Sequence, residues 1–346
     1  MSATLASLPE IEPAQASWMV LLTIGAIGGY MEIALEERGA ARYPQAAAFQ
    51  SARAALFALL ETGKPQRIWM PRLICDSIIA PILSAMVEVK FYALTPDLRV
   101  AEQVKLDRTD WLLYVNYFGI CGHASADALS RFGPERVILD HSQAFFTAPP
   151  DCLATIYSPR KFFGLPDGGL LVTQLPVPRP QETDTDSVGR MKHLLQRLDG
   201  SPEAGFPDYR AAEETLADFR PRSMSVLTRK LFASYDMEAA RARRNLNFKQ
   251  LHDLLGKRNS VPLALGAVDG PLGYPYAGKR PELRGALIER RVFVPTYWTE
   301  VLGRVERQSV EEYWVTSVLA LPCDQRYGDE EMKEMAGLVQ SLEESR

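Results

Sequence analysis

The stretch Tyr157-Ser-Pro-Arg-Lys-Phe-Phe-Gly-Leu-Pro-Asp-Gly-Gly-Leu170 lies between two apolar runs of the sequence. Lys161 stands in it, is followed directly by two phenylalanines, and has no second lysine nearby. Most lysines are solvated, but these apolar neighbours predict that Lys161 is withdrawn from water. Gly168 and Gly169 are expected to close the loop. Taken alone, the pattern is also that of an ordinary surface lysine between two strands.

Short apolar runs on both sides of this stretch predict β-strands that alternate with helices. The strands are expected at residues 67–70, 87–93, 110–116, 136–140, 155–157 and 169–173, and the helices at 51–61, 75–86 and 125–132. Because the strands are apolar on both faces, the pattern predicts an α/β fold with a mostly parallel sheet covered by helices.

Polar residues follow three of these strands. Asn116 and Asp140 end two of them, and Lys161 comes shortly after another. Ligands bind at the carboxyl ends of strands in such folds, so we expect the three to converge on one edge of the sheet. His141 and Gln143 lie within reach of the same edge. A desolvated lysine and a strand-end aspartate are the two protein groups that pyridoxal 5′-phosphate chemistry requires.

A phosphate also needs hydrogen-bond donors, and the start of the first predicted helix offers them. Ser51 precedes Ala52 and Arg53, so helix amides and a fixed positive charge would meet there. Ser158, three residues before Lys161, adds a hydroxyl. Each of these residues also has an ordinary interpretation, Ser51 as a helix cap and Asp140 or Ser158 as a turn residue.

The rest of the chain predicts a linker, a helical extension and a smaller unit. Residues 174–190 are expected to form an exposed loop, and residues 223–255 are expected to form a helix. The arginines of this helix are expected to be solvated; the alternative is that some of them bind a substrate phosphate. After residue 261 we expect a smaller α/β unit with strands at 291–294 and 317–321 and a closing helix at 329–342. The predicted domains are an N-terminal arm (1–25), a large domain (26–250) and a small C-terminal domain (251–346).

Composition excludes several classes of protein. The 346 residues carry a net charge of −4, which argues against nucleic-acid and anionic-membrane partners. The apolar segment 18–27 is too short to span a bilayer and is expected to be a strand or an arm. Four cysteines and four histidines lack metal-ligand spacing, so no metal is expected, and reduced thiols suggest the cytoplasm. No nucleophile elbow, P-loop or dinucleotide-binding pattern occurs.

In this order, the segments Ser51-Ala-Arg-Ala-Ala-Leu56, Asp140-His-Ser-Gln-Ala144 and Ser158-Pro-Arg-Lys161 with Asp167-Gly-Gly169 resemble three signatures of the DegT/StrS family. The resemblance covers about residues 26–342 and is weakest at 175–250. It looks closest to a branch found with surface-polysaccharide genes. The resemblance implies a fold-type I pyridoxal-phosphate enzyme, with a seven-stranded sheet in the large domain and a smaller C-terminal α/β domain.

The resemblance also implies roles for single residues. Lys161 would be the Schiff-base lysine and would move the proton, Asp140 would hold the ring nitrogen, and Gln143 would contact the ring oxygen. Phosphate would be bound by Ser51, Ala52, Arg53 and Ser158. A homodimer with the site at its interface is implied as well.

Three departures from the family pattern matter. Ala52-Arg53 replaces a small Gly-Thr pair, and the arginine could act as a phosphate clamp. Cys75 stands where an aromatic residue usually covers the ring, so Tyr117 or Phe118, next to Asn116, is a candidate cover. Segment 175–250 does not match the usual sugar-nucleotide contacts.

We therefore predict an aminotransferase that transfers an amino group from an amino-acid donor to a keto-sugar, nucleotide-linked by family resemblance, in surface-polysaccharide synthesis. One alternative is a pyridoxal-phosphate enzyme acting on another amine or carrying out elimination. The other is a non-catalytic protein of the same fold that works as a sensor or assembly partner.

Overall fold

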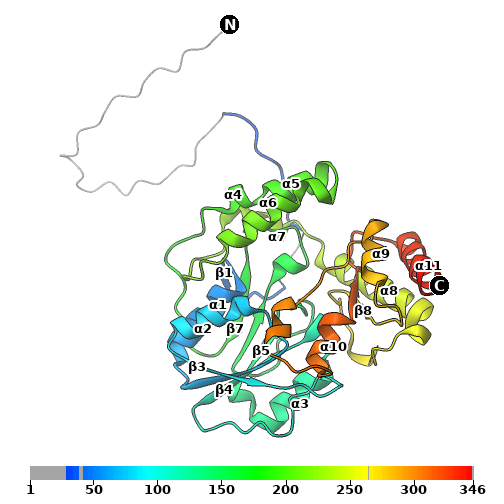
Figure 1. Cartoon of the computed structure of the whole chain (residues 1–346). Coiled ribbons are helices and arrows are strands. Elements are labelled where there is room, and N and C mark those ends of the chain that lie inside the picture. Colours follow the sequence, from blue (N-terminus) through cyan, green and yellow to red (C-terminus); the bar gives the residue numbers. More distant parts are fainter. Residues whose placement is uncertain (1–28, 39–41, 264, 345–346) are drawn as a thin grey trace. The chain divides into compact units, whose positions relative to one another are not determined.

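The computed structural model describes residues 29–38, 42–263 and 265–344 (Figure 1). The chain divides into two units, Met1–Leu35 and Glu36–Arg346. Within the first unit, the described residues 29–35 form no helix or strand. The predicted arm at 1–25 and the segment 18–27 lie outside the described residues. All the helices and strands given below belong to the second unit.

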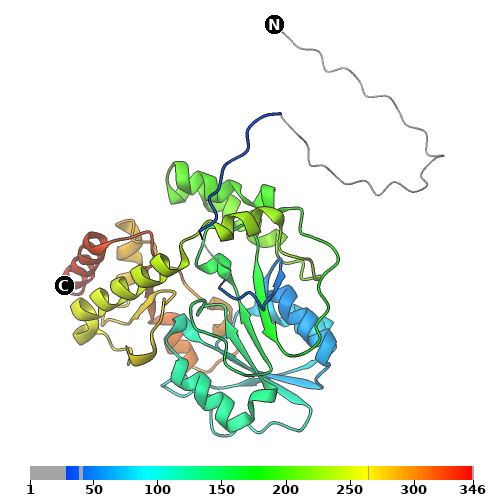
Figure 2. The same cartoon turned by 180° about the vertical axis from the view of Figure 1, so that it is seen from behind.

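A seven-stranded sheet forms the centre of the described part of the second unit (Figures 1 and 2). Its strand order is β1-β7-β6-β5-β4-β2-β3, and β7 alone runs opposite to the others. The strands are β1 (Ala47–Phe49), β2 (Arg67–Pro71), β3 (Glu88–Tyr92), β4 (Asp110–Val115), β5 (Val137–His141), β6 (Ala154–Tyr157) and β7 (Gly169–Thr173). The predicted mostly parallel α/β sheet is therefore confirmed.

Helices cover this sheet where the sequence predicts them. They are α1 (Ala52–Gly63), η1 (Asp76–Ile78), α2 (Ile79–Ser84) and α3 (Gly122–Phe132), with the short turns η2 (Tyr117–Gly119), η3 (Pro134–Arg136) and η4 (Pro159–Lys161). Helix α1 packs on β6 and β7, and α3 packs on β4 and β5. Helix α1 begins at its Ser51 cap and ends where Lys64 takes a left-handed conformation (φ 45°) before Pro65.

Residues between the sheet and the C-terminal part are more helical than predicted. They form α4 (Ser187–Arg190), α5 (Lys192–Asp199), α6 (Pro202–Thr215), α7 (Val226–Ala233) and α8 (Met237–Leu255). Helices α5 and α6 pack side by side as a hairpin (Figure 1). The predicted helix at 223–255 is interrupted at residues 234–236, where Asp236 caps α8. The expected loop is confirmed up to α4, but it is not exposed throughout, because Asp184 and Arg190 form a buried ion pair of 2.8 Å.

The C-terminal part contains a second, two-stranded antiparallel sheet among its described residues. Its elements are η5 (Gly256–Arg258), η6 (Leu265–Ala267), β8 (Tyr274–Tyr276), α9 (Leu283–Glu289), η7 (Thr299–Gly303), α10 (Val310–Thr316), β9 (Leu319–Leu321) and α11 (Asp329–Glu344). The strand predicted at 317–321 and the closing helix are confirmed. The strand predicted at 291–294 is wrong, because Arg291 has a left-handed backbone (φ 62°) that a strand does not accept. The predicted domain boundary at residue 250 falls inside α8 and stays a prediction.

Among the described helices, none combines the length and the apolar character that a membrane span requires.

Candidate active site

The predicted site residues come together at one edge of the large sheet, at the carboxyl ends of its parallel strands. Asp140 lies in β5 in register with Ile156 of β6, and Lys161 follows β6 within η4. Asn116 directly follows β4, and its backbone amide donates to the Asp140 carbonyl at 3.0 Å. The expected convergence of these three residues on one edge is what the strand order produces.

Lys161 is exposed to solvent in this structure, whereas the sequence predicts a lysine withdrawn from water. The aromatic residues beside it, Phe162 and Phe163, are buried with 3% and 5% exposure. The prediction was wrong because the two rings enter an aromatic cluster with Phe145 and Phe146 while the lysine side chain faces outward. The cluster anchors the loop, and the amine stays accessible to a ligand.

Asp140 is half-buried and keeps part of its carboxylate open. Its Oδ1 accepts a hydrogen bond from the Ser142 amide at 2.8 Å. No described residue donates to Oδ2. The Asp140 carboxylate is thus held in place on one side and can accept a proton-bearing nitrogen on the other.

The N-terminus of α1 forms a cup that we define as Ser51, Ala52 and Arg53. The buried Ser51 hydroxyl accepts from the Ala54 amide at 3.1 Å. The amides of Ala52 and Arg53 precede the first intrahelical bond, and no described residue accepts from them. Two backbone donors and the positive end of a twelve-residue helix therefore point at the same place, which is the arrangement that binds a phosphate.

A guanidinium lies beside this cup. Burial lowers the pKa of Arg53, the Glu213 carboxylate acts in the opposite direction, and the Arg160 guanidinium lowers it further. Arg160 itself pairs with Glu213 on α6. The Arg53 charge is therefore close to the residue that precedes Lys161, and an anion bound at the cup would relieve the repulsion between the two arginines.

Other predicted site residues hold the surrounding loops. The buried Asn116 accepts from the Cys121 amide through Oδ1 at 2.9 Å, and the buried Gln143 accepts from the Phe118 amide through Oε1 at 2.9 Å. Ser158 is buried at the start of η4 and makes no capping hydrogen bond. These contacts fix the turns that follow β4 and β5.

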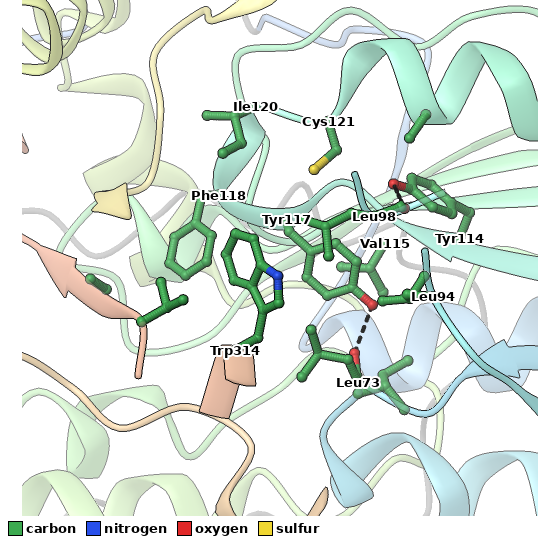
Figure 3. Packing of buried hydrophobic residues seen from close by; sticks show 14 of the residues in the cluster. Leu73, Leu94, Leu98, Tyr114, Val115, Tyr117, Phe118, Ile120, Cys121 and Trp314 are labelled. Atoms are coloured by element: carbon green, nitrogen blue, oxygen red, sulfur yellow. Dashed lines mark hydrogen bonds between the residues drawn. The ribbon is translucent and has the colours of Figure 1, made fainter. Parts of the chain in front are cut away.

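The residues considered as covers for a bound ring have different environments. Cys75 is exposed before η1. Tyr117 is fully buried and its hydroxyl donates to the Leu73 carbonyl at 2.8 Å, while Phe118 stacks on Trp314 with ring centroids 5.9 Å apart (Figure 3). Both aromatic side chains are therefore core residues in this structure, and Cys75 alone of the three is exposed.

Two residues that sequence reasoning missed hold the lysine loop from the C-terminal side. Gln325 donates to the Phe162 carbonyl at 2.7 Å, and Arg244 stacks on the Phe162 ring at 4.6 Å. Arg244 also donates to the carbonyl of Pro271 at 2.8 Å. It belongs to the run of arginines predicted to be solvated, but it is only 2% exposed. Nothing in the helical spacing distinguishes it from its exposed neighbours.

A cavity of about 540 Å³ lies between the α5–α6 hairpin and α11. His193 and Tyr209 line it, and the Arg160 guanidinium is one cause of the lowered pKa of His193, after burial. None of the predicted site residues lines this cavity, but Arg160, next to Lys161, pairs with Glu213 on α6, the helix that contributes Tyr209 to the cavity wall. Its walls also carry Arg197, Arg290, Arg326, Phe206 and Phe293.

No group of three or more His, Cys, Asp or Glu side chains suited to a metal ion is present within the described residues.

Comparison with known proteins places this geometry in a known fold. No protein-family model and no curated protein matches the sequence. Among solved structures, a putative sugar aminotransferase of Streptococcus pneumoniae in its apo form is similar with a TM-score of 0.62 at 13% identity, over 87% of this chain and 86% of that one. A DegT DnrJ EryC1 StrS aminotransferase from Brucella abortus is similar with a TM-score of 0.56 at 14% identity, over 87% and 86% of the chains.

The chain has the fold of the DegT/DnrJ/EryC1/StrS aminotransferases. A third similar structure is the Helicobacter pylori aminotransferase PseC, involved in pseudoaminic acid biosynthesis, with a TM-score of 0.58 at 13% identity over 87% of each chain. The predicted fold is confirmed, since the likeness covers 87% of this chain. At such low identity the comparison shows that the chain shares the aminotransferase fold, and it assigns no role to individual site residues.

Proposed function

We propose that this protein is a pyridoxal 5′-phosphate-dependent aminotransferase that delivers an amino group to a keto-sugar in surface-polysaccharide synthesis. One observation carries the proposal: Asp140, Lys161 and the open cup of α1 lie around the same edge of an aminotransferase-type sheet. These residues fit the cofactor, because they offer an amine, a carboxylate and phosphate donors, which are the groups that it requires.

Each residue has a proposed task. Lys161 Nζ would hold the cofactor covalently and would carry the proton that leaves the substrate carbon. The Asp140 carboxylate would keep the ring nitrogen protonated, and Gln143 would contact the ring oxygen. The bound cofactor supplies an electron sink for the electrons of the substrate C–H bond.

The phosphate is held by the other predicted residues. The amides of Ala52 and Arg53 and the hydroxyls of Ser51 and Ser158 supply hydrogen bonds, and the Arg53 guanidinium supplies charge. The Glu213 carboxylate that acts on Arg53 is itself paired with Arg160, so the Arg53 charge can serve the phosphate.

The cavity between the α5–α6 hairpin and α11 is the candidate place for the nucleotide part of a nucleotide-linked sugar. Arg197 and Arg290 can neutralise phosphates, and the exposed rings of Phe206 and Tyr209 can stack on a base. An amino acid would first reach Lys161 as the donor.

We further propose a homodimer, because the exposed Lys161 and the exposed Cys75 leave the cofactor position uncovered in a single chain. A second copy would exclude water from it. The cytoplasm is the proposed location, as the sequence predicts.

The half-reaction with the donor tests the function. Purified protein loaded with pyridoxal phosphate should convert it to pyridoxamine phosphate when glutamate or another amino acid is added, seen as a loss of visible absorbance. The function is wrong if the protein binds the cofactor but none of the twenty amino acids converts it. That outcome would favour the sensor or assembly alternative.

A further inference from the structure

A second carboxylate, which the proposed reaction does not use, ends the lysine stretch. Asp167 is fully buried, with 0% exposure. Its Oδ1 accepts from the Ser225 amide at 3.1 Å, and its Oδ2 accepts from the hydroxyls of Ser225 and Thr228 at 2.6 and 2.7 Å. Burial raises the pKa of Asp167, and these hydrogen bonds act in the opposite direction.

All three donors belong to the start of α7. Ser225 is the N-cap of that helix, and its hydroxyl oxygen also accepts from the Thr228 amide at 3.0 Å. Asp167 therefore places a negative charge at the positive end of α7, where it is favourable. The anion site of this helix is filled by the protein itself.

The two residues after Asp167 contact the other helix N-terminus. The Gly168 amide donates to the Gln50 carbonyl at 2.7 Å, and the Gly169 backbone lies directly on Ser51, where an added Cβ would come within 2.2 Å of the Ser51 carbonyl carbon. Three consecutive residues thus join the closed N-terminus of α7 to the open N-terminus of α1.

The chain segment before α7 is fastened to the same junction. The Gln50 side chain donates to the Arg220 carbonyl at 2.6 Å and accepts from the Arg222 amide at 2.9 Å. The start of α7 can therefore shift relative to the cup only if these bonds and those of Asp167 are broken. Lys161 lies six residues before Asp167 on the same loop.

We propose that Asp167 is a positioning residue that sets the cup of Ser51, Ala52 and Arg53 relative to Lys161, so that one cofactor reaches both. This inference rests on the proposed function and adds to it. Asp167 contacts neither Lys161 nor the cup through its side chain. It acts through Gly168 and Gly169. Its loss should therefore weaken the binding of the phosphate group.

The test compares two ligands, pyridoxal 5′-phosphate and unphosphorylated pyridoxal, by equilibrium titration of the full chain. The substitution is Asp167→Asn, because an amide has one acceptor oxygen and cannot serve all three donors. We expect the preference for the phosphorylated ligand, the ratio of the two Kd values, to fall about tenfold, while the Kd for pyridoxal changes little. A purely structural role would weaken both ligands equally and would overturn the proposal, as would an unchanged ratio.

A matched control is a buried carboxylate at the opposite edge of the sheet. Asp110, the first residue of β4, is 1% exposed and accepts from the Trp69 ring nitrogen at 2.8 Å and from the Asp107 amide at 3.1 Å. Asp110→Asn should lower the unfolding temperature but leave the ratio of Kd values unchanged. If it lowers the ratio as much as Asp167→Asn does, the proposal is wrong.

A milder variant protects the test against a failure to fold. Thr228→Val removes one of the three donors to Asp167 and should lower the ratio about threefold. If wild-type protein binds neither ligand, the proposed function itself fails. If wild-type protein prefers the phosphorylated ligand and both variants keep that preference, only the role of Asp167 is overturned.

Discussion

Gly169 lies so close to Ser51 that a single added carbon atom at residue 169 would come within 2.2 Å of the Ser51 carbonyl carbon and 2.4 Å of the Ala52 nitrogen. Both neighbours are backbone atoms, so they cannot rotate away. The glycine is needed because β7 starts where the cup of α1 begins. The loop that carries Lys161 and the helix that is proposed to bind phosphate are thereby held in contact.

Gly169→Ala should therefore disturb the cup. We expect a loss of about 2 kcal/mol in the free energy of unfolding and a weaker affinity for pyridoxal phosphate, because the backbone must shift. Urea unfolding and cofactor titration measure the two effects. The control is Gly285→Ala in α9, where nothing lies within 4 Å of the added carbon; it should be neutral or stabilise by about 1 kcal/mol. Equal behaviour of the two variants would refute the tight approach.

Tyr117→Phe separates a core role from a role in covering the cofactor. Removal of the hydroxyl leaves the buried Leu73 carbonyl without its donor, which should cost about 1 kcal/mol of stability. The absorbance spectrum of the bound cofactor should not change, because the ring packs in the core. A shifted absorbance maximum at unchanged stability would show that Tyr117 faces the cofactor after all.

Arg244→Met should destabilise the protein by about 3 kcal/mol, because the carbonyl of Pro271 and the Gln325 oxygen lose a buried donor. Its neighbour Arg243 is 38% exposed and pairs with Asp329 at the surface. Arg243→Met should stay within about 0.5 kcal/mol of wild type. The denaturant midpoints of the two variants measure this difference in stability. Similar midpoints would mean that Arg244 is not buried.

His141 predicts a pH dependence of stability. Burial lowers its pKa to about 4, while an unfolded chain takes up the same proton near pH 6.5. The unfolded state thus binds more protons between these values, so stability is full above about pH 6.5 and is lost as the pH falls toward 4, by up to about 3 kcal/mol. His141→Gln should remove this part of the dependence. Parallel stability curves for variant and wild type between pH 7.5 and 4.5 would contradict the burial of a neutral imidazole.

Six strands of the large sheet could be predicted from the sequence because they are short, mainly apolar runs bounded by glycine, proline or polar residues, whereas β1 (Ala47–Phe49), only three residues long, was missed. The convergence of Asp140 and Lys161 followed from the strand ends alone. Strand β8 was missed since it is only Tyr274-Pro-Tyr276, whose length and proline give no strand pattern. The strand predicted at 291–294 is absent because Arg291 has a left-handed backbone conformation. The composition of the segment does not reveal that conformation.

Parts of the site depend on contacts between distant residues, and no local pattern carries them. Asp167 meets Ser225 and Thr228 across 58 and 61 residues. Lys161 looks buried in the sequence because its neighbours are aromatic, but only the packing of Phe162 and Phe163 shows that the rings turn inward and leave the amine exposed. The roles proposed for Gln143 and Ser158 rest on resemblance together with their position at the sheet edge.

The most direct measurement is the covalent trapping of the cofactor. Wild-type protein incubated with pyridoxal phosphate and then reduced with borohydride should carry one pyridoxyl group, and peptide mass spectrometry should locate it on Lys161. Lys161→Ala should carry none at this site, while Lys192→Ala, at another lysine, should label as wild type does. Labelling spread over surface lysines, or persisting unchanged in Lys161→Ala, would contradict the account.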